Sequence, residues 1–433
     1  MGFGGHMLLN NKRFVSYAIF LSTSFVLLAG DVAPLKPSQG EAEIQMELGL
    51  SSFAKGDLKA AEAAFTESLR MNPGLPGSLV GMAGVAAKKG DTRQAESYYQ
   101  KALAAAPQNP AVQRSWNQYL VSQKRFGEAE ASLKKAIALS PKAAAVPQTE
   151  LGDLYLIAMN KPADALRAYR AALTLDPGSG PAHYGAGSAL TAVGDQAGAE
   201  GEFAAAQRAM PGDPMPIQAR GVIYMMQKKY PAAVQSFTQA LALRPDQVIW
   251  LMARAEAYEA LGNENKALKD YETCLKADPK YAQAYLKIGV IHQLNNRFAE
   301  AQKAYQSAIS IDPTQVYAYN NLAFGLAERK EQLNDALKWA NKAVELAPQL
   351  PQFQDTLAWV RRARGELDQA ARILEKSTTL KPELADVYYH LGIVYSEQGR
   401  NADAGEAFKK ALAMGSLANS GDARQRLARL TAQ

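Results

Sequence analysis

The 433-residue chain has little of the chemistry that usually marks an enzyme. It contains one cysteine, Cys274, so it cannot form an intramolecular disulfide, and it has only four histidines. No His-Glu-x-x-His helix, Cys-x-x-Cys pair or EF-hand loop occurs, which leaves a metal site without support. A Gly-x-x-x-x-Gly-Lys-Ser/Thr loop for phosphate is missing too. The sequence therefore predicts no enzyme activity, no cofactor and no metal.

Charge of one sign is not concentrated, and long apolar runs are rare. The net charge of +6 is modest for this length, and the basic clusters are scattered, so we do not predict nucleic-acid binding. The one long uncharged, largely apolar run is residues 14–30, preceded by Lys12 and Arg13. A basic flank and a short apolar run are typical of a secretory signal. We expect residues 1–30 to be a signal peptide or a retained signal anchor, and 31–41 to be a Pro-containing linker.

The chain is organised as a tandem repeat. Ten prolines recur along it, and seven of the nine gaps between them are 34 residues. They are Pro73, Pro107, Pro141, Pro177, Pro211, Pro245, Pro279, Pro313, Pro348 and Pro382. A period of this size indicates one supersecondary unit copied many times. The functional question is therefore which surface the array presents, and to which partner.

Each repeat reads as two helices. Twelve residues before each proline lies an alanine, four residues later a large residue that is usually aromatic, and three residues later a small one. These offsets place all three on one helical face. Proline ends this second helix, because it lacks an N–H and clashes with the preceding turn. An earlier helix carries a small residue about twelve positions before the alanine, except that the third repeat has Asn117 there. An extra residue is expected in the fourth repeat, around 158–162, and a one-residue shift in the ninth, near 326–335.

The pattern resembles the tetratricopeptide repeat family. The eighth repeat, for example, carries the family's positions as Tyr285, Ile288, Gly289, Ala301, Tyr305, Ala308 and Pro313. The resemblance implies an all-α fold, a right-handed superhelical solenoid of about eleven repeats over residues 42–416. A capping helix is expected over 417–433. It also implies that the first helix of each repeat lines a concave groove.

The later repeats are expected to carry the binding surface, because aromatic and amide side chains suit an extended or helical peptide. The predicted groove residues are Met252, Glu256, Tyr317, Asn320, Asn321, Phe324, Asp355, Trp359, Tyr389 and His390. The alternative is that several of these pack between neighbouring repeats. Some family members clamp the terminal carboxylate of heat-shock chaperones. Here Arg114 and Gln118 come nearest to that clamp, but Glu150 replaces its next amide, so a co-chaperone role is not expected.

The resemblance and the expected signal segment, residues 1–30, together predict a non-catalytic scaffold of the bacterial cell envelope. It would be periplasmic, or membrane-associated facing the periplasm, and would bind other proteins or peptide segments. A pilus, secretion or polysaccharide-export machine is the expected context, by analogy. One alternative is a membrane-anchored structural subunit that uses its convex face, with membrane contact only through a retained N-terminal segment. Another is an accessory protein to an enzyme. The oligomeric state is left open.

Overall fold

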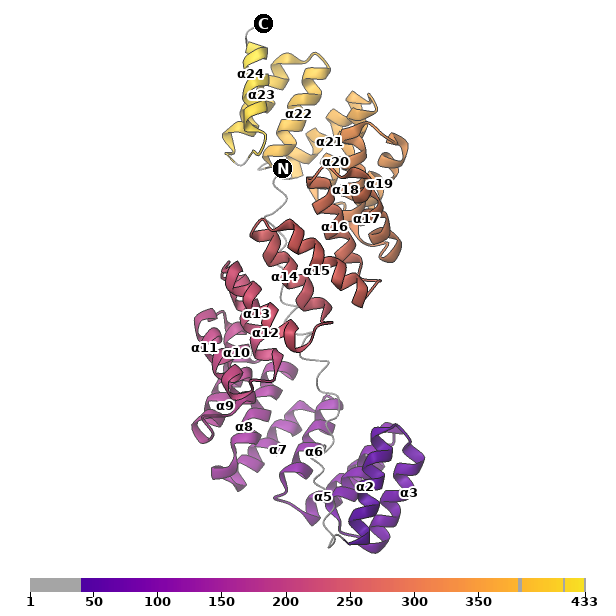
Figure 1. The fold of residues 1–433 in the computed structure, drawn as a ribbon, viewed down its shortest axis with the longest axis vertical. Coiled ribbons are helices and arrows are strands. Elements are labelled where there is room, and N and C mark those ends of the chain that lie inside the picture. The colour runs from indigo at the N-terminus through magenta and orange to yellow at the C-terminus, as the bar shows by residue number, and fades with distance from the viewer. Residues whose placement is uncertain (1–39, 381–383, 416, 432–433) are drawn as a thin grey trace. The chain divides into compact units, whose positions relative to one another are not determined.

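The structure is a computed structural model that describes residues 40–380, 384–415 and 417–431. Within these ranges every element of regular structure is a helix, and consecutive helices form hairpins (Figure 1). The described residues divide into two compact units, 40–223 and 224–431, and the division falls inside one helix, α12 (Pro214–Met226). The predicted signal or anchor segment, 1–30, lies outside the described residues, as does nearly all of the linker.

The N-terminal unit contains five consecutive hairpins followed by α12. Two short segments, η2 (Pro141–Ala143) and η3 (Leu154–Ala158), flank α8. The hairpins are α2 (Glu41–Ala54) with α3 (Leu58–Met71), α4 (Pro76–Lys88) with α5 (Thr92–Ala105), α6 (Pro110–Ser122) with α7 (Phe126–Leu139), α8 (Ala145–Asp153) with α9 (Pro162–Leu175), and α10 (Gly180–Val193) with α11 (Gln196–Ala209).

The C-terminal unit begins with the end of α12 and with α13 (Tyr230–Leu243), and five hairpins follow. These are α14 (Val248–Ala260) with α15 (Glu264–Ala277), α16 (Ala282–Leu294) with α17 (Phe298–Ile311), α18 (Val316–Arg329) with α19 (Leu333–Leu346), α20 (Pro351–Ala363) with α21 (Leu367–Leu380), and α22 (Ala385–Glu397) with α23 (Asn401–Ala413). A single helix, α24 (Ser420–Thr431), then packs on α23, in the region where the sequence predicts a cap. The prediction of an all-α repeat solenoid is confirmed.

The helix ends follow from the periodic prolines and from the turns between the paired helices. The second helix of a hairpin stops two residues before its proline, as α17 does before Pro313. The turn inside each hairpin has a residue with left-handed backbone shortly after the first helix ends, and the ninth turn has a second such residue, Gln332. The residues that follow the first helices are Gly56, Gly90, Lys124, Asn160, Gly194, Lys228, Gly262, Asn296, Lys330, Gly365 and Gly399. Glycine adopts this conformation without strain, whereas a side chain there costs free energy.

The seam of each hairpin is built from the predicted small and large residues. In the seventh hairpin Ala267, Tyr271 and Cys274 are all completely buried on one face of α15. In the first hairpin a Cβ atom on Gly49 would lie 2.5 Å from Cε1 of Phe65, so the ring fills the space that a side chain would take. The close approach of the two helices therefore depends on small residues facing rings, as the sequence predicts.

The irregular repeats absorb their extra residues locally. Gly152 and Ala165 are 13 residues apart, one more than the equivalent pair Gly187 and Ala199. The extra residue is taken up by η3, a π-helical turn in which the Met159 N–H donates to the Leu154 carbonyl at 3.1 Å. A π turn adds one residue without ending the helix. The insertion therefore begins slightly earlier than the predicted 158–162.

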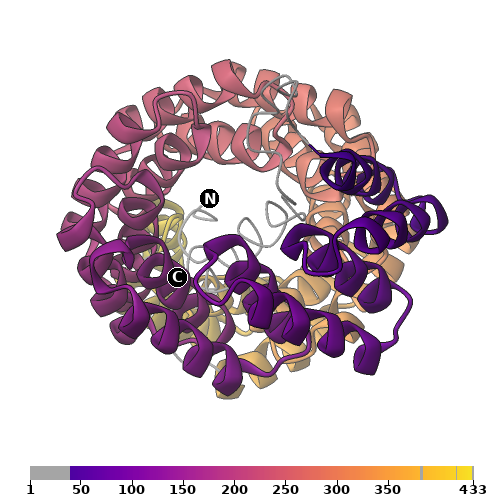
Figure 2. The same cartoon turned by 90° about the horizontal axis from the view of Figure 1, so that it is seen from below.

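Within each unit the first helices lie on the inside of a curve. First helices of consecutive hairpins contact one another, as α2 contacts α4 in the N-terminal unit and α18 contacts α20 in the C-terminal unit. No comparable contact joins second helices of consecutive hairpins among the described elements. The hairpins of the N-terminal unit drawn in magenta in Figure 2 show this arrangement, with one helix inside and its partner outside. The concave face of each unit is therefore made by first helices.

Candidate functional site

The candidate site is the concave face of the C-terminal unit, where side chains of α14, α16, α18, α20 and α22 meet. We call this face the C-terminal groove. Its helices are joined by bonds between consecutive repeats. Lys287 Nζ on α16 lies 3.0 Å from Glu259 Oε2 and 3.4 Å from Glu256 Oε1 on α14. Gln315, which caps α18, donates to Gln283 on α16 at 3.2 Å. The side chains that form these bonds between first helices lie on the concave face.

The predicted groove residues separate by burial. Four are buried: Met252, Asn320, Trp359 and Tyr389. Six keep part of their surface open: Glu256, Tyr317, Asn321, Phe324, Asp355 and His390. The buried four stabilise the walls of the groove more than they offer surface to a partner. The six partly exposed residues remain the predicted contact residues.

Asp355 and His390 form a close contact between two first helices in the groove. The imidazole Nδ1 of His390 on α22 lies 2.8 Å from each carboxylate oxygen of Asp355 on α20. The ring of Trp359 lies 4.3 Å from the imidazole, centre to centre. Burial disfavours the charged imidazole, but the carboxylates of Asp355, Asp386 and Glu328 outweigh it and raise the pKa of His390. His390 therefore links two repeats and favours its protonated form.

Trp359 extends this contact to a third repeat. Its Nε1–H donates to the Glu328 carboxylate on α18, and the Arg362 guanidinium lies 4.2 Å from its ring centre. Arg362 in turn donates from Nε to Glu397 Oε2 on α22 at 2.9 Å. Charged groups on α18, α20 and α22 thus meet around one indole ring. Trp359 therefore packs between neighbouring repeats. This is the predicted alternative to a side chain that offers its surface to a partner.

Two adjacent amides occupy the middle of the groove. Asn320 Nδ2 donates to Asn321 Oδ1 at 3.3 Å, while Asn320 Oδ1 has no hydrogen-bond partner among the described residues. Tyr317 lies one turn earlier on α18, and its ring packs edge-on against Phe353 with centroids 5.5 Å apart. This part of the groove combines partly open aromatic surface with amides.

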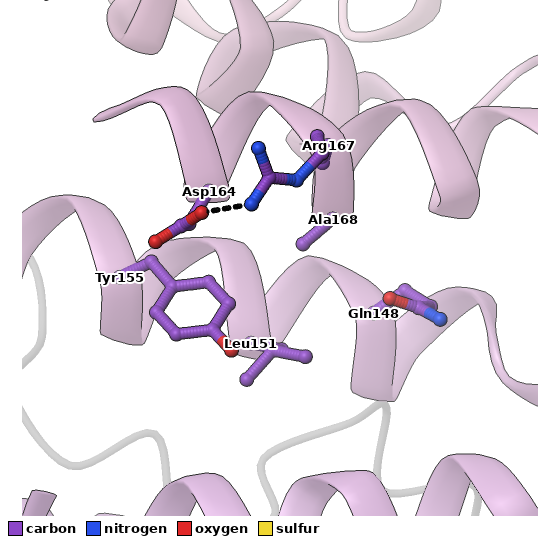
Figure 3. Close-up of a pocket in the computed structure, with 6 residues that line it drawn as sticks. All are labelled: Gln148, Leu151, Tyr155, Asp164, Arg167 and Ala168. Carbon is purple, nitrogen blue, oxygen red and sulfur yellow. Dashed lines mark hydrogen bonds and ion pairs between the residues drawn. The ribbon is translucent and has the colours of Figure 1, made fainter. Parts of the chain in front are cut away.

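A second hollow lies in the N-terminal unit, beside the π turn, and sequence reasoning did not single it out (Figure 3). Its volume is about 220 Å³. It is lined by Gln148, Leu151, Tyr155, Asp164, Arg167 and Ala168. Asp164 and Arg167 pair with each other, and the Tyr155 hydroxyl donates to Glu130 at 2.9 Å. Organic ligands usually occupy about 300–1,000 Å³, so this hollow is too small for a cofactor. The sequence feature that could have drawn attention to this hollow is the extra residue of the fourth repeat.

Arg114, which comes nearest to a clamp residue for a chaperone's terminal carboxylate, already pairs with Glu150 of the same chain. Arg114 Nε on α6 lies 2.6 Å from Glu150 Oε1 on α8. Burial raises the pKa of Glu150, although Arg114 opposes the shift. The guanidinium thus already has an anionic partner, which would compete with a terminal carboxylate.

Other chemistry is sparse in the residues that the structure describes. No group of three or more His, Cys, Asp or Glu side chains there is arranged to hold a metal ion. In the same ranges, no helix combines the length and hydropathy that a bilayer span requires. Burial raises the pKa of the Cys274 thiol to about 11, so it stays protonated at neutral pH.

Stacked hairpins whose first helices form a concave face within each unit define a helical repeat solenoid, a class whose extended inner surface serves binding. Sequence models of the tetratricopeptide repeat match residues 52–115, 154–214, 219–273, 253–316 and 385–414, and a TPR repeat model matches 360–399. Together these matches span well over half of the chain. The chain belongs to the tetratricopeptide repeat family.

Similar proteins share only part of their length with this chain. A small glutamine-rich tetratricopeptide repeat-containing protein of Mycosarcoma maydis is 32% identical over 28% of this chain and 33% of its own length. A heat-shock protein cognate co-chaperone of Aspergillus fumigatus is 33% identical over 27% of this chain and 35% of its own. The chain thus spans about a third of these relatives. The crystal structure of a tetratricopeptide repeat protein from Parabacteroides merdae is 24% identical, with a TM-score of 0.47, over 57% of this chain and 96% of that one.

Proposed function

We propose that the chain is a non-catalytic scaffold that holds a segment of another protein in the C-terminal groove. The observation that carries this is the row of partly exposed side chains on the inner face of α18, namely Tyr317, Asn321 and Phe324. Aromatic rings bury surface at low entropic cost, and an amide can pair with a peptide backbone. An extended segment or a helix would both fit a face built this way.

The scaffold would act outside the cytoplasm, in the bacterial cell envelope. This part of the proposal rests on the sequence of residues 1–30, in which a basic pair precedes an apolar run. Assembly of a pilus, secretion or polysaccharide-export machine is the proposed context. If residues 14–30 are retained, the chain would instead be an anchored structural subunit whose convex face makes the contacts. Mass spectrometry of the mature N-terminus distinguishes the two.

A co-chaperone adaptor is the second candidate, favoured by the name of the similar Aspergillus fumigatus protein, a heat-shock protein cognate co-chaperone. Such an adaptor would bind a chaperone through that chaperone's terminal carboxylate. The pairing of Arg114 with Glu150 counts against this candidate, because the cation nearest to a clamp already has a partner. Binding of a free carboxy-terminal peptide that is lost on Arg114→Ala would favour the adaptor.

The groove proposal is tested with the double variant Asn321→Ala, Phe324→Ala. We expect this variant to lose partners captured by affinity purification while its far-ultraviolet circular dichroism stays unchanged. The matched control is Lys303→Ala, Gln306→Ala, which alters exposed residues of the second helix α17. Equal capture by both double variants would place the partner site elsewhere.

A further inference from the structure

We infer that the segment bound by the C-terminal groove is basic: a stretch of partner polypeptide that carries lysine or arginine side chains. The inference rests on the proposed function, because it names the partner class of the same groove. It does not follow from the charge of the chain as a whole, which is +6. It follows from how charge is distributed along the groove.

The groove is acidic although the chain is basic. Bonds between consecutive first helices identify most of its charged side chains, and Asp386 lies one turn before His390 on the same face of α22. The carboxylates are Glu256, Glu259, Glu328, Asp355, Asp386 and Glu397. The permanent cations on this face of the described helices are Lys287 and Arg362. Three other cations of the first helices, Arg254, Arg329 and Arg361, bond inside their own hairpins, to Asp270, Glu331 and Glu366.

Both cations of the groove are already occupied. Lys287 is shared between Glu256 and Glu259, and Arg362 is held by Glu397. In contrast, no hydrogen bond or ion pair joins the Asp386 carboxylate to another described residue, and Glu256 remains 41% exposed. The groove therefore has acceptors to spare and few free donors, which suits a ligand that brings cations.

A buried amide oxygen independently indicates a ligand that brings hydrogen-bond donors, as lysine and arginine side chains do. Asn320 is only 2% exposed, and its Oδ1 accepts no hydrogen bond from the described residues. Asn320 and Asp355 occupy the same position in consecutive first helices, so both side chains are directed to the groove. A buried carbonyl oxygen without a donor is costly, and a donor that arrives along the groove would remove that cost.

The open rings beside these acceptors suit long cationic side chains. Tyr317 and Phe324 lie on α18 next to the amide pair and keep part of their surface open. The methylene stem of a lysine or arginine can cover such a ring, and its charged head interacts favourably with the ring face. An acidic segment would gain neither contact and would meet the carboxylates directly. The groove thus favours a basic segment over an acidic one.

The test measures binding of labelled peptides to the full chain by fluorescence anisotropy. The probes are three twelve-residue peptides in which alanine alternates with lysine, glutamate or glutamine. We expect the lysine peptide to bind more tightly than the other two, with an affinity that falls as salt rises from 50 to 500 mM. Glu256→Gln with Asp386→Asn should weaken it by about tenfold, since each exposed ion pair contributes a few-fold at most.

The matched control removes two exposed carboxylates from second helices, as Glu272→Gln with Glu406→Gln. This control should leave the affinity for the lysine peptide unchanged, and an equal loss would overturn the inference. Tighter binding of the glutamine or glutamate peptide, lost in Asn321→Ala, Phe324→Ala, would also overturn it while preserving the proposed function. If no peptide of a random displayed library binds the chain, the proposed function itself fails.

Discussion

The ring of Tyr305 occupies the space that a side chain on Gly289 would need. A Cβ atom at residue 289 would lie 2.5 Å from Cε1 of Tyr305. Tyr305 cannot move away easily, because it is buried and its hydroxyl donates to Gln293 at 2.7 Å. Gly325, on the neighbouring first helix, is different: its Cβ would meet nothing closer than 3.9 Å.

These two glycines give a matched pair of substitutions. Gly325→Ala should raise the free energy of unfolding by about 0.5–1 kcal/mol, because alanine loses less conformational entropy in a helix. Gly289→Ala should lower it by about 1–3 kcal/mol, because the added methyl overpacks the seam. Urea denaturation followed by circular dichroism measures both. Equal effects of the two variants would show that the seam is not tight at residue 289.

Lys124 holds the left-handed turn position of the third hairpin, where several other repeats have glycine. Its φ is 58°. Lys124→Gly should raise the free energy of unfolding by about 1 kcal/mol, because the side chain is strained there. Lys135→Gly, in the interior of α7, should lower it by about 1 kcal/mol instead. Thermal melts of both variants check the sign, and a destabilised Lys124→Gly protein would contradict the assigned turn.

Asn117 occupies the small position of α6, and its side chain is buried. Neither Oδ1 nor Nδ2 has a hydrogen-bond partner among the described residues. Asn117→Ala should raise the free energy of unfolding by about 1–2 kcal/mol, because an unpaired buried amide is removed and alanine favours the helix. Hydrogen exchange of α6 and α7 should slow accordingly. Faster exchange in the variant would mean that the amide has a stabilising partner.

The link between His390 and Asp355 makes stability depend on pH. The pKa of His390 is raised in the folded chain, so its contribution is complete below the unfolded value of about 6.5. That contribution is lost as the pH rises through the folded pKa. The melting temperature should therefore fall between about pH 6 and 8 more steeply for the parent than for His390→Gln. The comparison with this variant is needed because burial lowers the pKa of His292, which acts with the opposite sign.

Identical profiles for the parent and His390→Gln would show that the imidazole charge does not couple the last repeats. Asp355→Asn should flatten the profile in the same way, because the main carboxylate that favours the charged imidazole is removed.

The sequence predicted what depends on neighbours along the chain. Periodic prolines predict where second helices end, and the spacing of Ala301, Tyr305 and Ala308 predicts the buried face of α17. Both follow from helical geometry alone.

What the sequence could not predict depends on how one hairpin is rotated against the next. Asp355 and His390 are 35 residues apart, and nothing local indicates that they touch. The same holds for Trp359 and Glu328, and the burial of Trp359 follows from these contacts. The π turn at Leu154–Ala158 also escaped prediction, because an extra residue can be absorbed in a helix or in a turn. Only the structure therefore shows which of the predicted groove residues are buried and which remain partly exposed.

The lone thiol of Cys274 is a built-in probe of how often part of the solenoid opens. It is completely buried on the inner face of α15 in the seventh hairpin, and it is the only cysteine of the chain. A thiol-reactive dye can reach it only when the helices that cover it separate, so its labelling rate reports how often this part of the array opens. Partner binding that tightens the middle of the array would slow that rate without any engineered label.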